Sequence, residues 1–115
     1  MKYALLIYGD ETGSAAGTPE EQAGEGEAYE KYMAWLSEKG WMRGGEELHH
    51  TQQATTVRAP GGTPITTDGP FAETKEQLGG FFIIETADLD EAIEAAAACP
   101  GTKHGSVEIR PIADM

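Results

Sequence analysis

The sequence predicts a single α+β domain, and two patterns support this prediction. Short, continuously apolar stretches of strand length begin near residue 3 and again at residue 81, and two other segments carry apolar residues at helical spacing. A chain of 115 residues has room for one hydrophobic core. We therefore expect residues 1–115 to form one domain, without internal repeats or linkers.

The first part of the chain predicts a strand followed by a helix. Residues 3–8 are apolar throughout, which is typical of a central strand covered on both faces. After a polar loop, residues 18–21 (Thr-Pro-Glu-Glu) form a capping box with proline at the first helical position, and Gly40 is expected to end the helix. The predicted inner face of this helix comprises Tyr29, Tyr32, Met33 and Leu36.

The middle of the chain predicts an extended segment and a hairpin. Residues 41–48 are expected to be extended, with a break at the two glycines 44–45. Residues 54–58 are rich in β-branched side chains, and a Pro-Gly-Gly turn connects them to residues 63–67. This combination predicts a β-hairpin.

The last part predicts a strand, a helix and a final strand. Residues 81–85 are expected to form a second buried strand, and a capping box at residues 88–91 opens a helix that Pro100 and Gly101 end. The final strand covers about residues 106–112. The predicted inner face of this helix comprises Leu89, Ala92, Ile93, Ala96 and Ala97.

This order of elements predicts a ferredoxin-like split β-α-β arrangement with an extra β-hairpin. Both helices then lie on one face of an antiparallel sheet. The other face carries much of the apolar surface and needs a cover. Because a second copy of the chain is the simplest cover, we expect a homodimer.

Charge and composition exclude some classes of function. The chain has 20 acidic and 8 basic side chains, a net charge of -12, and such a surface repels the phosphates of nucleic acids. The segment from Asp10 to Glu30 is acidic and has no Lys or Arg; it is either a solvated surface or a docking surface for a basic partner. No apolar stretch reaches the length of a membrane span. The single Cys99 excludes an intrachain disulfide, fits a reducing cytoplasm and is expected to serve in packing.

Residues 67–80, TDGPFAETKEQLGG, form the most distinctive segment. Asp68 can accept backbone hydrogen bonds, Gly69 permits unusual dihedral angles and Pro70 fixes the next step, so a rigid turn is expected. Phe71 is expected to anchor this loop to the core. Four charged side chains follow or belong to the same turn: Asp68, Glu73, Lys75 and Glu76.

The string TDGPFAETKEQLGGFF resembles the DGPF motif of the YCII-related proteins, and the resemblance extends from KYALLIYGDE near the beginning to GSVEIRP near the end. It implies a dimeric α/β-barrel with a cleft beside each sheet. It also implies a bacterial cytoplasmic protein, often encoded near extracytoplasmic-function sigma factors. Some members of the wider superfamily are thought to use a His–Asp pair with the His on the first helix, and one is a lyase-type dehydrochlorinase. The first helix here has no His, so this pair cannot be carried over.

The candidate catalytic residues are Asp68 and Glu73. Asp68 is either a turn-forming aspartate or a general base, and the second role needs a pKa raised by burial or by another carboxylate such as Glu73. Lys75 is either a ligand-binding cation or a counter-charge for these acids. The candidate ligand-binding residues are Tyr29, Tyr32, Phe71, Lys75 and Arg110.

Other interpretations of these residues stay open. Tyr29 and Tyr32 are alternatively aromatic residues of the core or of a dimer interface, together with Trp35 and Trp41. Arg110 alternatively pairs with a nearby acid such as Glu108.

The histidines do not predict a metal site. His49 and His50 are adjacent, and adjacent side chains of a strand point to opposite sides. His104 is isolated. We therefore predict neither a metal nor a cofactor.

Three functions are compatible with these observations. The first is a homodimeric protein that binds a small molecule in a cleft beside the 67–80 loop. The second is an acid–base enzyme, of the lyase or hydrolase type, that uses Asp68 and Glu73. The third is a regulatory partner of a sigma factor, which would be bound by the acidic segment between Asp10 and Glu30.

Overall fold

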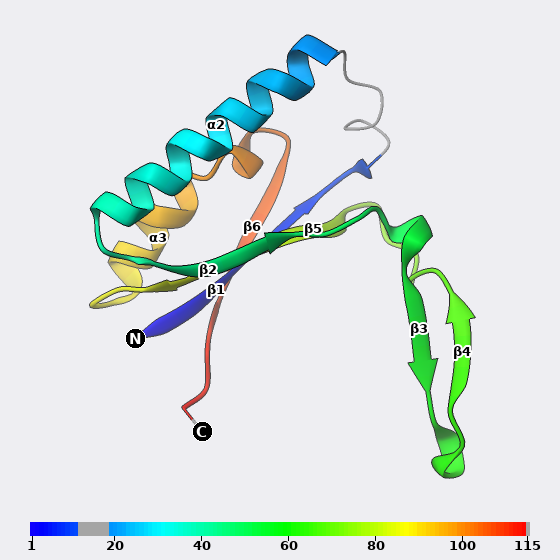
Figure 1. Ribbon diagram of the computed structural model, residues 1–115. Coiled ribbons are helices and arrows are strands. Elements are labelled where there is room, and N and C mark those ends of the chain that lie inside the picture. Colours follow the sequence, from blue (N-terminus) through cyan, green and yellow to red (C-terminus); the bar gives the residue numbers. More distant parts are fainter. Residues whose placement is uncertain (12–18, 115) are drawn as a thin grey trace.

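A four-stranded antiparallel sheet with two helices on one face forms the body of the molecule (Figure 1). The structure is a computed structural model, and it describes residues 1–11 and 19–114. The strands lie in the order β2-β5-β1-β6. They comprise β1 (Lys2–Gly9), β2 (Met42–Glu47), β5 (Gln77–Glu85) and β6 (Gly105–Pro111). The helices are α2 (Pro19–Glu38) and α3 (Leu89–Ala97). The predicted ferredoxin-like α+β fold is confirmed.

The hydrophobic core lies between the sheet and the two helices. Alternate residues of the central strands point into it, among them Leu5 of β1 and Ile84 of β5, both of which have no exposed surface. Leu36 of α2 fills the same layer. None of the described helices has both the length and the apolar character needed to span a membrane.

Helix α2 begins at Pro19 and ends before Gly40, as predicted; Thr18, its expected cap, lies outside the described residues. At its end, Gly40 has a φ of 75°, and the Trp41 N–H donates to the Leu36 carbonyl over 3.0 Å. This Schellman arrangement needs a left-handed residue, which glycine supplies without steric cost. The predicted inner face is correct for Tyr32 and Leu36, whereas Met33 is 38% exposed.

Helix α3 begins as predicted but presents a different face to the core. The Asp88 carboxylate accepts a hydrogen bond from the Glu91 N–H over 3.0 Å. The prediction that Leu89 and Ile93 point inward was wrong, because they are 50% and 48% exposed, and Ala97 is exposed as well. The buried side chains of this helix are Ala92, Ala95 and Ala96.

A hydrogen bond from α2 accompanies this orientation of α3. The Tyr32 hydroxyl of α2 donates to the Ala95 carbonyl of α3 over only 2.6 Å. Ala92, Ala95 and Ala96 are buried on the side of α3 that packs on the core, and the longer Leu89 and Ile93 side chains are exposed.

The face of the sheet opposite the helices is not covered by any element of the described chain. Its centre is apolar, because Leu6 pairs with Phe81 and Ala4 pairs with Ile83 across β1 and β5. These side chains are half-buried. Residues 3–8 were expected to be covered on both faces. Within the single chain, only the face toward the helices is covered.

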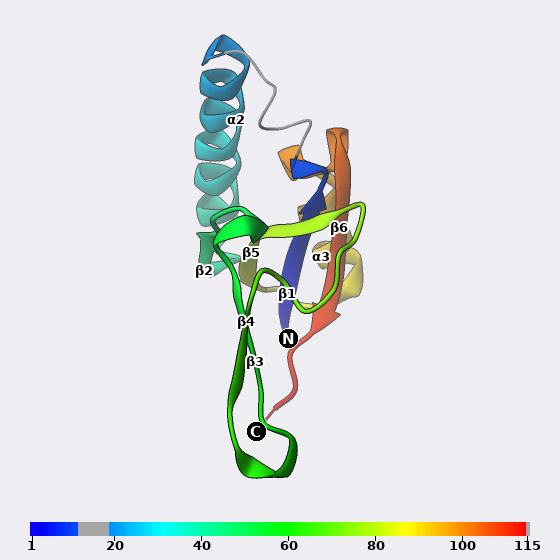
Figure 2. The same cartoon turned by 90° about the vertical axis from the view of Figure 1, so that its right-hand side faces the viewer.

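A two-stranded arm is inserted between β2 and β5 and extends away from the sheet, as Figure 2 shows. We use "arm" for residues 54–69, which contain β3 (Thr55–Arg58) and β4 (Ile65–Asp68) and confirm the predicted hairpin. All of β4 is exposed. The radius of gyration is 16.0 Å, whereas about 13 Å is expected for a compact chain of this length.

Candidate functional site

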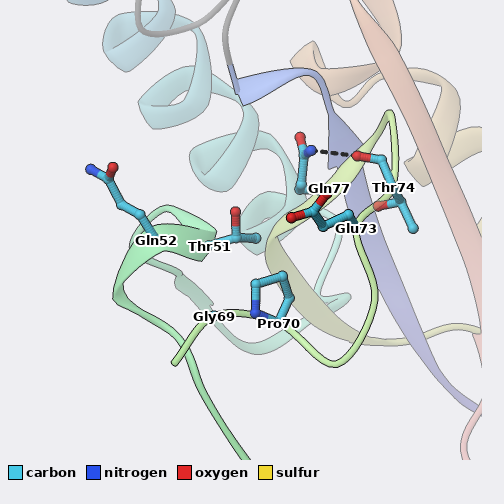
Figure 3. Close-up of a pocket in the computed structure, with 7 residues that line it drawn as sticks. All are labelled: Thr51, Gln52, Gly69, Pro70, Glu73, Thr74 and Gln77. Carbon is cyan, nitrogen blue, oxygen red and sulfur yellow. Dashed lines mark hydrogen bonds between the residues drawn. The ribbon is translucent and has the colours of Figure 1, made fainter. Parts of the chain in front are cut away.

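The signature segment lines a hollow of about 400 Å³ at the base of the arm, where the chain returns to β5. Figure 3 shows the residues that surround it: Thr51, Gln52, Gly69, Pro70, Glu73, Thr74 and Gln77. Thr51 and Gln52 belong to a short 3-10 helix (Thr51–Gln53) that precedes the arm. The hollow is therefore formed by the two segments that flank the arm, together with Gly69 at the end of the arm.

Hydrogen bonds hold the walls of this hollow in place. The Gln77 side chain donates from Nε2 to the Thr74 carbonyl over 2.6 Å and accepts at Oε1 from the Glu11 N–H over 3.1 Å. The Glu11 carboxylate in turn accepts from the N–H and the hydroxyl of Thr51, over 2.8 and 2.7 Å. Glu11 thus connects both walls to the end of β1.

Gly69 forms the turn at the end of the arm. Its φ of 93° lies in the region that favours glycine, as predicted. Its N–H donates to the Ala54 carbonyl over 2.7 Å, and its own carbonyl accepts from the Thr56 hydroxyl over 2.8 Å. Within the described residues, the Asp68 carboxylate accepts no hydrogen bond, so the backbone of Gly69 and not the side chain of Asp68 holds this turn.

The structure separates the two candidate catalytic carboxylates. Glu73 lines the hollow, and its carboxylate has no hydrogen bond or ion pair to any residue that the structure describes. Asp68 ends β4 opposite Thr55, is exposed and does not line the hollow. One carboxylate, rather than a pair, is therefore available to a molecule in the hollow.

Phe71 and Lys75 also lie outside the lining of the hollow. Phe71 is 78% exposed, so the prediction that it anchors the loop to the core was wrong for the single chain. The physical reason is that the loop leaves the arm where no core lies beneath it. Lys75 is exposed and makes no ion pair within the described part of the chain, so a counter-charge contact with Asp68 or Glu73 is not observed.

The two candidate tyrosines lie on the helical side of the sheet. Tyr32 is buried and packs edge-on against Phe82, with ring centroids 5.4 Å apart, and Tyr29 stacks on the same ring at 6.3 Å. Burial raises the pKa of both hydroxyls above the ordinary value, and the neighbouring Cys99 raises it further. Neither lines the hollow, and the interpretation of Tyr32 as a core residue is confirmed.

Arg110 forms an ion pair and Cys99 is packed in the core, and both of these roles are among those expected from the sequence. Arg110 lies on β6 beside Ala4, and its Nε donates to the Glu108 carboxylate over 2.7 Å. Cys99 is buried, as expected for a packing role. Burial raises the pKa of its thiol, partly offset by hydrogen bonds from the Gly101 backbone and from Tyr29.

The three histidines are exposed: His49 and His50 lie between β2 and the Thr51–Gln53 helix, and His104 precedes β6. Across residues 1–11 and 19–114, no cluster of three or more His, Cys, Asp or Glu side chains has the arrangement needed to hold a metal ion.

Sequence reasoning missed Glu11, Thr51 and Gln77. Gln77 was within the signature, but nothing in its local pattern distinguishes it from a surface residue. Glu11 and Thr51 are 40 positions apart, and such a long-range contact leaves no local signal.

The fold and the hollow together define an α+β domain of the ferredoxin-like class with a polar, arm-flanked candidate site. The chain belongs to the family of the YCII-related domain, which it matches over residues 1–115. It is 41% identical over 124 residues to an uncharacterised protein of Rhizobium meliloti (strain 1021), and this similarity covers 98% of the present chain and 93% of the relative.

Proposed function

We propose that the protein is a homodimer that binds a small polar molecule in the hollow at the base of the arm. The observation that carries this proposal is the unpartnered Glu73 carboxylate in a hollow whose walls are fixed by hydrogen bonds. The hydrogen-bonded walls need no ordering when a ligand binds, so the cost of ordering falls on exposed side chains such as Glu73. The resemblance to the DGPF subgroup of the family agrees with this position for the site.

The lining of the hollow indicates the chemistry of the ligand. Thr51 and Thr74 supply hydroxyl groups, Gln52 supplies an amide, and Glu73 supplies the one carboxylate. Such a site favours a neutral or cationic molecule with hydrogen-bond donors, because an anion would be repelled by Glu73. We assign Glu73 to ligand recognition rather than to an acid–base pair with Asp68, which does not line the hollow.

The homodimer rests on two apolar surfaces that a single chain leaves uncovered. The open face of the sheet presents Leu6, Phe81 and Ile83 along its centre. The arm presents Val57 and Ile65, which are 60% and 55% exposed. Two sheets packed face to face in an α/β-barrel would cover the open face, and a two-fold axis makes such a contact self-complementary.

Ligand binding can be tested by thermal shift against a panel of small polar metabolites. We expect at least one amino- or hydroxyl-bearing compound to raise the melting temperature of the wild-type protein, and Glu73→Gln to abolish the increase. Glu76→Gln is the matched control, since Glu76 is exposed and does not line the hollow. A panel without any stabilising compound, or equal shifts in both variants, would contradict the proposed site.

The dimer can be tested separately by size-exclusion chromatography with light scattering. We expect a mass of twice the 12.3 kDa of one chain. Phe81→Glu places a charge on the open face and is expected to give a folded monomer. Ile93→Glu, on the exposed side of α3, serves as the control and is expected to remain dimeric. A monomeric wild-type protein would rule out the dimer while leaving the ligand test unaffected.

A further inference from the structure

We propose a second binding site, for a small organic carboxylate with an apolar body, in a groove between α2 and the segment that follows α3. The groove has a volume of about 440 Å³ and is lined by Lys31 and Trp35 of α2 and by Cys99, Pro100 and Lys103 after α3. It shares no residue with the hollow at the base of the arm. Its size lies within the range of small-molecule sites.

The charge of this groove is opposite to that of the chain as a whole. The protein has 20 acidic and 8 basic residues, yet the groove is lined by two lysines and no Asp or Glu. The described part of the chain contains three ion pairs, which engage Lys39, Arg43 and Arg110. Lys31 and Lys103 take part in none of them, so both ammonium groups are available to an anion.

The floor of the groove is apolar and held in place. Tyr32 and Cys99, which line the groove, are only 4% and 1% exposed. The chain leaves α3 through a 3-10 helix (Pro100–Lys103), in which the Thr102 hydroxyl and N–H donate to the Cys99 carbonyl over 2.9 and 3.1 Å. These bonds fix the turn that carries Lys103. An apolar floor with cationic groups above it matches a molecule with a hydrocarbon body and a carboxylate end.

The site is also accessible in the proposed homodimer. Its residues belong to the helical layer, and Figure 1 shows that α2 and α3 lie on the face of the sheet opposite the side toward which the arm extends. The two sites therefore differ in both place and charge: the hollow contains Glu73, whereas the groove contains Lys31 and Lys103.

Benzoate is a suitable probe, with benzamide as its uncharged analogue of nearly the same shape. Titration of the isotopically labelled full chain, followed by amide NMR, is expected to show saturable shifts around Lys31, Trp35 and Lys103 for benzoate. Benzamide is expected to bind more weakly by up to about fivefold, which is the factor that a surface ion pair contributes.

Variants assign the effect to the groove. Lys31→Gln and Lys103→Gln are each expected to weaken benzoate binding severalfold, whereas Lys75→Gln, a lysine outside the groove, is expected to leave it unchanged. Glu73→Gln is also expected to leave it unchanged, so failure of this site and failure of the proposed function are distinguishable. Because these side chains are exposed, the variants are expected to fold, and their circular dichroism spectra check this.

Three results would overturn the proposal. The first is equal binding of benzoate and benzamide, and the second is equal weakening by Lys75→Gln. The third is binding of a tetraglutamate peptide at the groove without binding of benzoate, since this would assign the two lysines to an acidic protein segment instead.

Discussion

Tyr32 illustrates how one side chain can connect three elements of this fold. Its ring packs against Phe82 of β5, and its hydroxyl donates to the Ala95 carbonyl near the end of α3. The last carbonyls of a helix lack partners within the helix. Tyr32 therefore satisfies a buried acceptor as well as filling the core, which is why a tyrosine serves here better than a phenylalanine.

Replacing Tyr32 by phenylalanine removes this hydrogen bond and leaves the ring in place. We expect Tyr32→Phe to lower the free energy of unfolding by about 1–2 kcal/mol, the usual effect of leaving a buried polar group without a partner. Urea denaturation measures the change. Tyr8→Phe is the control and should change it little, because the Tyr8 hydroxyl makes no hydrogen bond within the described residues. An equal loss in both variants would contradict the role of the Tyr32 hydroxyl.

The buried tyrosines also predict a dependence of stability on alkaline pH. Burial raises the pKa of Tyr29 and Tyr32 above the ordinary value of 10.0. As pH rises past that value, the unfolded chain releases these protons before the folded chain does, so the free energy of unfolding falls. We expect the fall between about pH 8 and about pH 11 to be smaller in the Tyr29→Phe, Tyr32→Phe double variant. Urea denaturation at the two pH values tests this, and equal falls would contradict it.

At the scale of elements, α3 shows which features the sequence could predict. The capping box at Asp88 is a local signal, and the helix begins there. The face that points inward is not a local property, because it depends on how the helix packs against the rest of the core. Leu89 and Ile93 are the more hydrophobic side chains, but the buried side of α3 carries Ala92, Ala95 and Ala96.

This orientation of α3 can be tested by a pair of substitutions. Ala95→Leu adds volume to a fully buried position and is expected to lower the free energy of unfolding by about 1–3 kcal/mol. Ile93→Gln changes an exposed position and is expected to alter it by less than about 0.5 kcal/mol. Thermal melting followed by circular dichroism compares the two. A larger loss of stability in Ile93→Gln than in Ala95→Leu would instead support the inner face that the sequence predicted.

Within residues 67–80, Asp68 and Gly69 also show that local features can be predicted from the sequence, whereas contacts with distant residues cannot. The sequence correctly predicted a turn and the need for glycine at position 69, because both follow from local backbone chemistry. The partners of this turn, Ala54 and Thr56, come from the other strand of the arm. Whether a carboxylate lies in the hollow likewise depends on where the loop returns to the sheet, so Asp68 and Glu73 could not be separated in advance.

At the scale of the whole molecule, the sheet and the arm are distinct parts. Every strand of the sheet is paired with other strands of the sheet, and the arm pairs only within itself. The order of elements along the chain was sufficient to predict the ferredoxin-like frame, because few topologies accommodate two such helices on one face. The direction in which the arm extends could not be predicted, since no local pattern encodes it.

Removing the arm tests this division. The Gly69 N–H and the Ala54 carbonyl are 2.7 Å apart across the base of the arm, so two glycines can replace residues 55–68 without disturbing the sheet. We expect the shortened chain to keep its helical circular dichroism signal and a cooperative thermal transition. Loss of cooperative melting would show that the arm is needed for the sheet to fold.

The central position of β1 has a consequence for synthesis on the ribosome. Its two neighbours, β5 and β6, begin at Gln77 and Gly105, so β1 is synthesised long before either of its partner strands. At roughly 5–20 residues per second, the interval before both neighbours exist lasts several seconds. Until β5 is complete, the apolar residues 3–8 have no partner strand on either edge, and until β6 is complete they have one on a single edge. Translation speed therefore sets how long these apolar residues stay without partner strands and accessible to chaperones.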